Sequence, residues 1–322
     1  MSETSMKQHL RATYPSDNLN FTFEPDRNKL QEHLATTTIL VDGSAQDIAL
    51  DAPKLKHVIV PWAGTTQLRD KLLARPHLTL HNSHYNASFV AQYAVAMMFA
   101  AAHRLPYADR RLRTGDWTMR YDTSFGAMQL AGKTVLLLGY GAIGQAIARL
   151  LHPFGMKVTV LKRTPDVYDS ANADILNRIY TPADMFSALA AADVIMCSLP
   201  LTPTTETLLD ARALSHLKPH SILVNVGRGQ VIHEEALYNH LLNQPRCVAA
   251  LDVWWQNAGK HTDEPSFPAT YPFWELPNVI MGPHRAGQVK GNNQTRFEDV
   301  AQTIAALCRG EMRNQVNIQQ GY

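Results

Sequence analysis

The chain has 322 residues, a length that suggests two domains. Apolar residues make up 45% of it and charged residues 18%, which is enough to form a sizeable core. The formal net charge is only +2, and this argues against a nucleic-acid-binding protein, because such proteins usually carry a strong basic surplus.

The cysteines and the apolar stretches bear on the compartment. Cys197, Cys247 and Cys308 lie far apart and form no CxxC pair, so we interpret them as small side chains of a protein from a reducing compartment. The first 20 residues lack the apolar core of a signal peptide, and the most apolar stretch, residues 89–102, is too short to span a bilayer. We therefore expect a cytoplasmic protein without nucleic-acid or membrane partners, and the scattered histidines predict no metal site.

The first part of the chain alternates between short apolar runs and polar segments. Residues 1–35 are polar and weakly patterned. The apolar runs that follow are 38–41, 57–60 and 78–80. Helix-compatible segments separate these runs, which predicts a small α/β unit. Residues 88–104 read as one long helix that is apolar on most faces and so packs between two bodies, which places a domain boundary near 103–108.

From residue 132 onward, strand-like and helix-like segments alternate clearly. The strand-like runs are 135–138, 158–161, 194–199, 222–226, 248–253 and 279–281. The helical segments between them are 143–151, 183–191, 211–217 and 234–242. Because nearly continuous apolar strands alternate with helices, we predict a parallel sheet that is covered on both faces. A last helix is expected at about 297–308, and we interpret it as the chain crossing back to pack on the first domain.

A glycine-rich hexapeptide follows the first of these strands directly and opens a helix. It reads Gly139-Tyr140-Gly141-Ala142-Ile143-Gly144. In this setting Gly139 allows the tight turn, Gly141 lets a pyrophosphate approach the backbone, and Gly144 lets the helix pack against the strand. The helix N-terminus, with Ala142 and Ile143, supplies N–H groups and a positive dipole end to the phosphates. The hexapeptide therefore predicts a dinucleotide site.

The end of the second strand bears on the choice of dinucleotide. An enzyme that prefers NAD usually has Asp or Glu there, to accept hydrogen bonds from the ribose hydroxyls. This chain has Lys162 and Arg163 instead, followed by the hydroxyl of Thr164. Two cations and a donor suit a 2′-phosphate, so we favour NADP, with NAD possible. The alternative interpretation is a solvated basic strand end.

Three functional side chains follow the later strands. Arg228 comes after the fourth strand, Asp252 ends the fifth, and His284 comes after the sixth. Ligands of open α/β sheets bind beyond the carboxyl ends of the strands, so these three residues and the glycine loop are expected at one edge.

Five segments together resemble the D-isomer-specific 2-hydroxyacid dehydrogenase family, which is related to glyoxylate/hydroxypyruvate reductases, phosphoglycerate dehydrogenases and formate dehydrogenases. They read GYGAIG, SLPLTPTT, LVNVGRGQVI, ALDVWW and GPHRAG, and the resemblance covers roughly residues 55–290. It implies an α/β fold in which a doubly wound parallel Rossmann sheet is inserted into a smaller flavodoxin-like α/β substrate domain. The substrate domain would comprise residues 1–103, completed by the C-terminal helix 291–322, and the dinucleotide-binding domain residues 104–290. The resemblance also suggests a homodimer through the Rossmann domain.

The resemblance implies roles for single residues. Arg228 would hold the substrate carboxylate and polarise the keto oxygen, and its planar fork suits a carboxylate. His284 would donate and accept the proton, a task for a group that titrates near neutral pH. Asp252 would bond the nicotinamide amide. The Trp62-Ala63-Gly64 segment would grip the carboxylate with N–H groups, although a tight apolar turn is the alternative interpretation. Further residues expected to line the cofactor are Leu199, Pro200, Thr205, Val226 and Gly287.

The sequence departs from the family pattern at the expected acidic partner of His284. The family usually has an acid about five residues after the aspartate, where this chain has Asn257, preceded by Gln256. The first Glu-Pro is later, at Glu264. Related formate dehydrogenases have an amide at this place. The leading hypothesis is therefore an NADP-preferring reductase of small 2-keto acids such as glyoxylate or hydroxypyruvate, with a formate-type dehydrogenase and a non-catalytic, corepressor-like dinucleotide sensor as alternatives.

Overall fold

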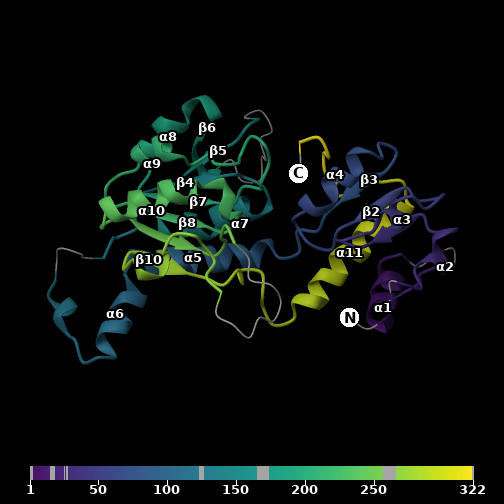
Figure 1. The fold of residues 1–322 in the computed structure, drawn as a ribbon, viewed down its shortest axis with the longest axis horizontal. Coiled ribbons are helices and arrows are strands. Elements are labelled where there is room, and N and C mark those ends of the chain that lie inside the picture. Colours follow the sequence, from purple (N-terminus) through teal and green to yellow (C-terminus); the bar gives the residue numbers. More distant parts are fainter. Residues whose placement is uncertain are drawn as a thin grey trace. The chain divides into compact units, whose positions relative to one another are not determined.

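The computed structural model describes residues 3–14, 19–24, 26, 28–122, 127–164, 174–256 and 266–320. The chain forms two compact units (Figure 1). The first unit combines the two ends of the chain, Met1–Asn86 and Val289–Tyr322, and the second unit is Ala87–Gln288. The second unit is thus inserted into the first.

A parallel sheet organises the second unit. Among the described residues it has seven strands, in the order β10-β9-β8-β7-β4-β5-β6, and every neighbouring pair is parallel. The strands are β4 (Thr134–Leu138), β5 (Lys157–Leu161), β6 (Leu176–Tyr180), β7 (Val194–Cys197), β8 (Ile222–Asn225), β9 (Val248–Leu251) and β10 (Val279–Met281). The strand order reverses beside β4, as in a Rossmann sheet, so the predicted doubly wound fold is confirmed.

Helices cover both faces of this sheet because its central strands are apolar on both sides. Val135 and Leu137 of β4 pack in one core cluster, with α5 (Ala87–Ala102) and α7 (Ala142–Leu151). Leu136 and Leu138 face the other way and pack in a second cluster with three further helices. These helices are α8 (Met185–Ala191), α9 (Ala211–Ser215) and α10 (Glu234–Asn243). Successive residues of a strand point to opposite faces, so one apolar strand contributes to both cores.

Strand β6 was not predicted from the sequence. It reads Leu-Asn-Arg-Ile-Tyr, and only its last residue, Tyr180, is buried. The strand lies at the edge of the sheet and pairs with β5 alone. An edge strand needs little apolar surface, which explains why its sequence lacks the apolar run of the central strands.

Helix α5 belongs to the second unit, whereas the sequence analysis placed it in the first domain. Its 16 residues are strongly apolar, and the buried ones pack against α7 and β8. The apolar character that suggested a helix between two bodies therefore serves the core of the Rossmann sheet. Among the described residues, no helix is both long and apolar enough to cross a membrane.

The first unit contains a smaller parallel sheet with the order β1-β2-β3. Its strands are β1 (Ile39–Val41), β2 (His57–Ile59) and β3 (Thr79–His81), which matches the three predicted runs. The helices of this unit are α1 (Glu3–Thr13), α2 (Gln31–Leu34), α3 (Asp47–Leu50), α4 (Thr66–Leu73) and α11 (Asn292–Cys308). Helix α11 packs on the sheet and on α1, through a cluster that includes Leu10, Ile59 and Ile304.

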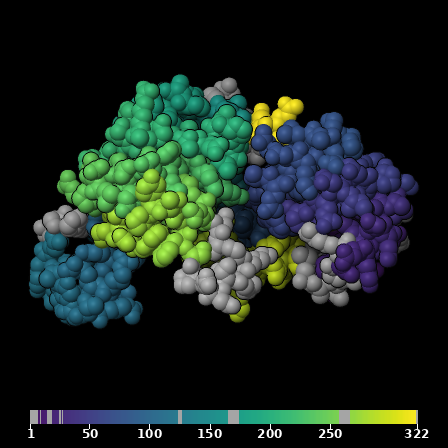
Figure 2. Space-filling view, viewed as in Figure 1, coloured from purple at the N-terminus to yellow at the C-terminus, as the bar shows by residue number. Residues whose placement is uncertain are grey.

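Helix α6 (Leu105–Leu112) follows α5 in the second unit and has no buried residue. Leu105 is 56% exposed and Leu112 49%, and the turn after the helix exposes Trp117 (63%) and Tyr121 (79%). Figure 2 shows this blue segment standing clear of the green and teal body of the second unit. Helix α6 and the residues that follow it therefore form an arm whose large apolar side chains are not covered by the described chain.

Candidate active site

The glycine loop lies at the carboxyl end of β4, and two of its positions require glycine. Gly139 has a φ of 94°, which side chains rarely adopt. A Cβ on Gly144 would lie 2.3 Å from the carbonyl oxygen of Gly139, so only glycine lets α7 approach the turn. The loop also lies beside the end of β7, since a Cβ on Gly139 would meet the Leu199 side chain at 3.0 Å. Gly139 thus makes the turn and Gly144 lets α7 pack against it, while their part in binding a dinucleotide stays a prediction.

The N-terminus of α7 fits a phosphate. Gly141 is its N-cap residue, and no side chain caps the helix. The first N–H groups of a helix, here those of Ala142 and Ile143, have no acceptor within the helix and carry its positive dipole end. A Cβ on Gly141 would meet nothing within 4 Å, so this glycine leaves open space beside the helix end. An open, uncapped helix end is what a dinucleotide pyrophosphate requires.

The predicted residues for the 2′-phosphate lie next to the glycine loop. The Gly139 N–H donates to the Leu161 carbonyl at 3.2 Å, which puts the ends of β4 and β5 side by side. Lys162, Arg163 and Thr164 follow β5 directly, with Lys162 half-buried and the other two exposed. Their positions are compatible with contacts to the ribose end of a dinucleotide.

A tight turn follows β7 at the predicted cofactor residues. The Thr205 hydroxyl donates to the Pro200 carbonyl at 2.6 Å and accepts from the Thr202 N–H at 2.8 Å. Thr205 therefore holds the backbone of the turn together, while Leu199 and Pro200 remain half-buried.

Arg228 stands on a turn that a buried asparagine holds. The Asn225 side chain, 1% exposed, donates to the Arg228 carbonyl at 3.0 Å and accepts from the Gly227 N–H at 3.0 Å. The Arg228 guanidinium donates to the Gly227 carbonyl at 2.7 Å. Burial leaves the Arg228 charge poorly solvated, and this lowers the pKa of Arg228 below its ordinary value. An anion bound beside the guanidinium would compensate for the lost solvation. The N–H of Val226 is already used, since it donates to the Cys197 carbonyl.

The Asp252 carboxylate organises the turn that carries His284. Asp252 is 1% exposed, and its two oxygens accept from the N–H groups of Arg285 (3.0 Å) and Ala286 (2.9 Å). Tyr93 lies beside Asp252, and burial followed by the aspartate charge raises the pKa of Tyr93. A Cβ on Gly282 would lie 2.5 Å from the Asp252 carboxylate, so this position excludes a side chain. The carboxylate thus has a structural task besides the nicotinamide contact predicted for it.

His284 lies in a left-handed backbone conformation, with a φ of 53°, and its side chain is exposed. For a residue other than glycine this backbone is uncommon and clusters at functional sites. Of the three candidate partners for its ring, Asn257 and Glu264 lie outside the described residues. Gln256 is described, and its amide donates to the Thr270 hydroxyl at 3.0 Å.

The Trp62-Ala63-Gly64 loop belongs to the first unit and follows β2. Trp62 is 39% exposed, and its ring lies so close to Gly43 that no Cβ would fit there. No described residue accepts a hydrogen bond from the N–H of Ala63 or Gly64. Helix α4 starts two residues later, and its N-cap, Thr65, makes no side-chain cap. Two consecutive N–H groups next to a helix N-terminus are donors suited to an anion.

The second unit brings most predicted site residues to one edge of its sheet. Arg228, Asp252 and His284 follow β8, β9 and β10, which are neighbours in the sheet. The sequence analysis missed the supporting residues Asn225 and Tyr93. A buried polar residue at a strand end was the available signal for Asn225, whereas no sequence signal linked Tyr93 to a residue more than a hundred positions away.

Among the described residues, no three His, Cys, Asp or Glu side chains are placed to hold a metal ion. His216 and His220 have a four-residue spacing that suits a helical metal site, but α9 ends at Ser215. The His216 ring stacks on Phe186 instead, and its Nδ1 donates to the Arg212 carbonyl at 2.8 Å.

Comparison with known proteins assigns the family. The model of the D-isomer specific 2-hydroxyacid dehydrogenase NAD binding domain matches residues 95–286. D-3-phosphoglycerate dehydrogenase of Mycobacterium bovis is 32% identical over 292 residues, which are 89% of this chain and 52% of that protein. The chain therefore spans about half the length of this relative.

Two further relatives match over most of their length. Glyoxylate/hydroxypyruvate reductase B of Pectobacterium carotovorum is 30% identical over 85% of this chain and 82% of that protein. The structure of a probable 2-hydroxyacid dehydrogenase from Rhizobium etli, in complex with NADP, HEPES and L(+)-tartaric acid, superposes with a TM-score of 0.78. It is 20% identical and covers 100% of this chain and 97% of that one, so it supports the fold. The chain belongs to the D-isomer specific 2-hydroxyacid dehydrogenase family of oxidoreductases.

Proposed function

We propose that the protein reduces a small 2-keto acid, of the glyoxylate or hydroxypyruvate type, with NADPH. The observation that carries this proposal is the order Arg228, Asp252, His284 at the ends of three neighbouring strands. It supplies a cation, a carboxylate that organises the histidine turn, and a proton donor at one sheet edge. A dinucleotide-binding protein without catalysis would need neither a poorly solvated arginine nor a strained histidine turn.

In this proposal Arg228 binds the substrate carboxylate and the keto oxygen. Its turn is fixed by Asn225, and because the guanidinium is largely buried, pairing with an anion would compensate for its lost solvation. Hydrogen bonds from arginine to a carboxylate are charge-assisted and can be bidentate, so they fix orientation as well as affinity. Negative charge that develops on the keto oxygen during reduction would be stabilised by the same cation.

His284 would complete the reduction by protonating the keto oxygen. When bound, NADPH supplies the hydride that forms the new C–H bond at the keto carbon. The C=O bond becomes a C–O single bond, and its oxygen takes one proton from the imidazolium of His284. The imidazole that remains regains a proton from water before the next turnover.

The cofactor preference rests on Lys162, Arg163 and Thr164. Their place beside the glycine loop, together with the absence of an acid at the end of β5, supports NADPH over NADH. Leu199, Pro200, Thr205, Val226 and Gly287 would line the dinucleotide, and the oxygens of Asp252 retain lone pairs for the nicotinamide amide. In the first unit, the N–H groups of Ala63 and Gly64 would bind the carboxylate.

The test is a substrate panel combined with a histidine variant. Purified protein is mixed with glyoxylate, hydroxypyruvate or pyruvate and either NADPH or NADH, and separately with formate and NADP or NAD, while absorbance at 340 nm is followed. We expect consumption of NADPH with a keto acid and no reaction with formate. His284→Ala should abolish reduction and leave NADPH binding, titrated by fluorescence, nearly intact. Formation of reduced cofactor from formate would instead indicate the formate type, and binding without any turnover the sensor.

A further inference from the structure

The C-terminal segment of the chain pairs with β3 of the first unit through an isolated β-bridge. Gln315 bridges His81 in antiparallel fashion, and the Val316 N–H donates to the Leu80 carbonyl at 2.8 Å. Val316 is 4% exposed and packs in the core of this unit. The segment is therefore fixed to the carboxyl end of β3, the strand that pairs with β2, which the 62–64 loop follows.

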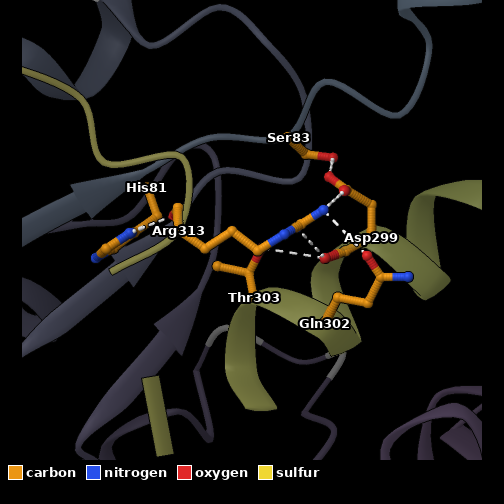
Figure 3. Close-up of polar contacts among 6 residues, drawn as sticks. All are labelled: His81, Ser83, Asp299, Gln302, Thr303 and Arg313. Atoms are coloured by element: carbon orange, nitrogen blue, oxygen red, sulfur yellow. Dashed lines mark hydrogen bonds and ion pairs between the residues drawn. The ribbon is translucent and has the colours of Figure 1, made fainter. Parts of the chain in front are cut away.

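Arg313 fastens this segment to helix α11 (Figure 3). Its guanidinium donates to the Asp299 carboxylate at 2.7 Å, to the Gln302 side chain at 3.0 Å and to the Thr303 hydroxyl at 2.8 Å. It also donates to the Asp299 carbonyl at 3.0 Å. Four hydrogen bonds to three residues of one helix give the arginine a single defined position.

The same cluster holds residues 81–83. The Ser83 hydroxyl donates to the second carboxylate oxygen of Asp299. The Nδ1 of His81 lies 2.8 Å from the Arg313 carbonyl, and because a carbonyl only accepts, this nitrogen carries the proton. Burial lowers the pKa of His81 and so favours its neutral form, in which Nε2 accepts from the Thr79 hydroxyl at 2.8 Å.

Residues 82 and 83 in turn hold the 62–64 loop. The Ser83 N–H donates to the Trp62 carbonyl at 3.3 Å, and the Asn82 side chain, 6% exposed, donates to the Ala63 carbonyl at 3.0 Å. In a planar trans peptide the C=O and the following N–H point in opposite directions. With both carbonyls turned toward residues 82 and 83, the N–H groups of Ala63 and Gly64 must point away from them.

We propose that Arg313, Asp299 and Ser83 are positioning residues for the substrate carboxylate. Together with the C-terminal segment they hold residues 82 and 83, which turn the carbonyls of the 62–64 loop inward and its N–H groups outward, toward an anion. This inference rests on the proposed function for its substrate, but the geometry it predicts belongs to the loop itself. It assigns a role in substrate binding to residues that touch no substrate.

The test compares Arg313→Ala and Ser83→Ala with a matched control, Arg309→Ala. Arg309 stands in the same segment, but its side chain pairs with Glu311 at the surface. Hydrogen exchange is measured by mass spectrometry on peptides that cover residues 60–66, with β1 as the internal reference. We expect faster exchange at 60–66 in both test variants, with β1 unchanged, and wild-type exchange in the control.

Kinetics give the second readout. The KM for the keto acid should rise about tenfold in Arg313→Ala, because a loosened anion site loses substrate affinity, while the NADPH dissociation constant should stay within about twofold. Arg313→Lys, which keeps the charge beside Asp299, should recover part of the affinity.

Unchanged exchange at 60–66, or faster exchange with an unchanged KM, would overturn the inference. Should Arg313→Ala fail to fold, Ser83→Ala decides by the same criteria. Should the wild type reduce no keto acid, the proposed function fails, and the exchange data alone decide whether the cluster orients the loop.

Discussion

At the scale of single residues, the site depends on side chains that serve as supports. Asn225 uses both ends of its amide to hold the turn of Arg228, and Asp252 uses both oxygens to hold the turn of His284. A functional residue on a loop is precise only if its backbone is fixed, and here buried polar groups provide that constraint. The polar character of Asn225 at a strand end was a sequence signal, but the backbone contacts that Asn225 and Asp252 make could not be inferred from the sequence.

Arg228 provides the first prediction at this scale. Arg228→Lys keeps the charge but loses the bidentate fork, and Arg228→Ala loses both, so each should lower kcat/KM for the keto acid. For the alanine variant we expect a loss of about 2–4 kcal/mol in transition-state binding, the size of one charge-assisted contact. Steady-state kinetics measure the loss, with the exposed Arg246→Ala as control. A kcat/KM of Arg228→Ala equal to that of wild type would rule out the assignment.

Cofactor choice gives the second prediction. Lys162→Asp combined with Arg163→Ala places an acid where a ribose hydroxyl would be bound and removes a cation that a 2′-phosphate would need. The ratio of kcat/KM for NADPH to that for NADH should fall by at least about tenfold, the effect of one lost charge-assisted contact. The ratio is measured for the wild type and for the double variant at equal ionic strength, because salt screens contacts to phosphate. A wild type that already prefers NADH would contradict the prediction.

At the scale of elements, the N-terminus of α7 has two glycines that are required for different reasons. A Cβ on Gly144 would lie 2.3 Å from the Gly139 carbonyl oxygen, whereas one on Gly141 would meet open space. Gly144 is therefore required because α7 packs on the turn. Gly141 leaves room for a ligand, here the proposed pyrophosphate, at the helix end. The two positions can be separated by experiment.

The third prediction compares these two glycines. Gly144→Ala should lower the free energy of unfolding by about 1–3 kcal/mol, the usual cost of overpacking, because α7 must move. Gly141→Ala should leave the unfolding midpoint unchanged but raise the NADPH dissociation constant at least about tenfold, since its methyl group would occupy the path of the pyrophosphate. Thermal unfolding without cofactor and fluorescence titration measure the two effects. Equal destabilisation by both variants would show that the distinction is wrong.

Asp193 provides the fourth prediction, at the start of β7. Burial alone would raise the pKa of Asp193, but hydrogen bonds from Lys218 (2.8 Å) and from the Thr134 N–H (2.9 Å) outweigh it and lower the pKa. Because its folded-state pKa lies below the unfolded value of about 3.9, the ionised group stabilises the fold above about pH 4. This contribution is lost as the pH falls through the folded pKa.

Asp193→Asn should accordingly lower the free energy of unfolding near pH 7 by about 1–3 kcal/mol and weaken its dependence on pH below 4. Urea unfolding at a series of pH values measures both changes. Glu311→Gln is the control, because its ion pair with Arg309 lies at the surface. If the free energy of unfolding fell with pH below 4 in the same way for Asp193→Asn and for the control, the pairing of Asp193 would not contribute to stability in acid.

At the scale of the whole molecule, the sequence predicted those parts whose burial is periodic. Central strands with two apolar faces were recognised, as were helices between them. Strand β6, at the sheet edge, lacks that periodicity, and α6 has no buried residue that ties it to the core; both were missed. The polar first 35 residues concealed α1, which packs on a helix nearly three hundred residues later in the chain. Long-range contacts of this kind leave no local signal.

The fifth prediction concerns the apolar arm formed by α6 and the turn that follows it. We expect this arm to pair with the same surface of a second copy, because an exposed apolar patch of this kind marks an interface and homo-oligomers are most often symmetric dimers. Sedimentation equilibrium should give about twice the chain mass of 35.9 kDa. Leu105→Glu with Leu112→Glu should give the monomer mass. Leu242→Glu, an exposed leucine on α10, should leave the dimer intact. A wild type with the monomer mass would refute the pairing.

The insertion of one unit into the other imposes an order on biosynthesis. Residues 87–288 are contiguous, so the Rossmann unit can fold as soon as its own last strand has emerged from the ribosome. The first unit must wait, because α11 and Val316 contribute to its cores and are translated some two hundred residues after its sheet. Until then the sheet β1-β2-β3 lacks one helical cover, and its apolar face is available to chaperones. The 62–64 loop of the first unit, proposed to bind the substrate carboxylate, is therefore among the last parts of the protein to become native, whereas Arg228 belongs to the unit that can fold first.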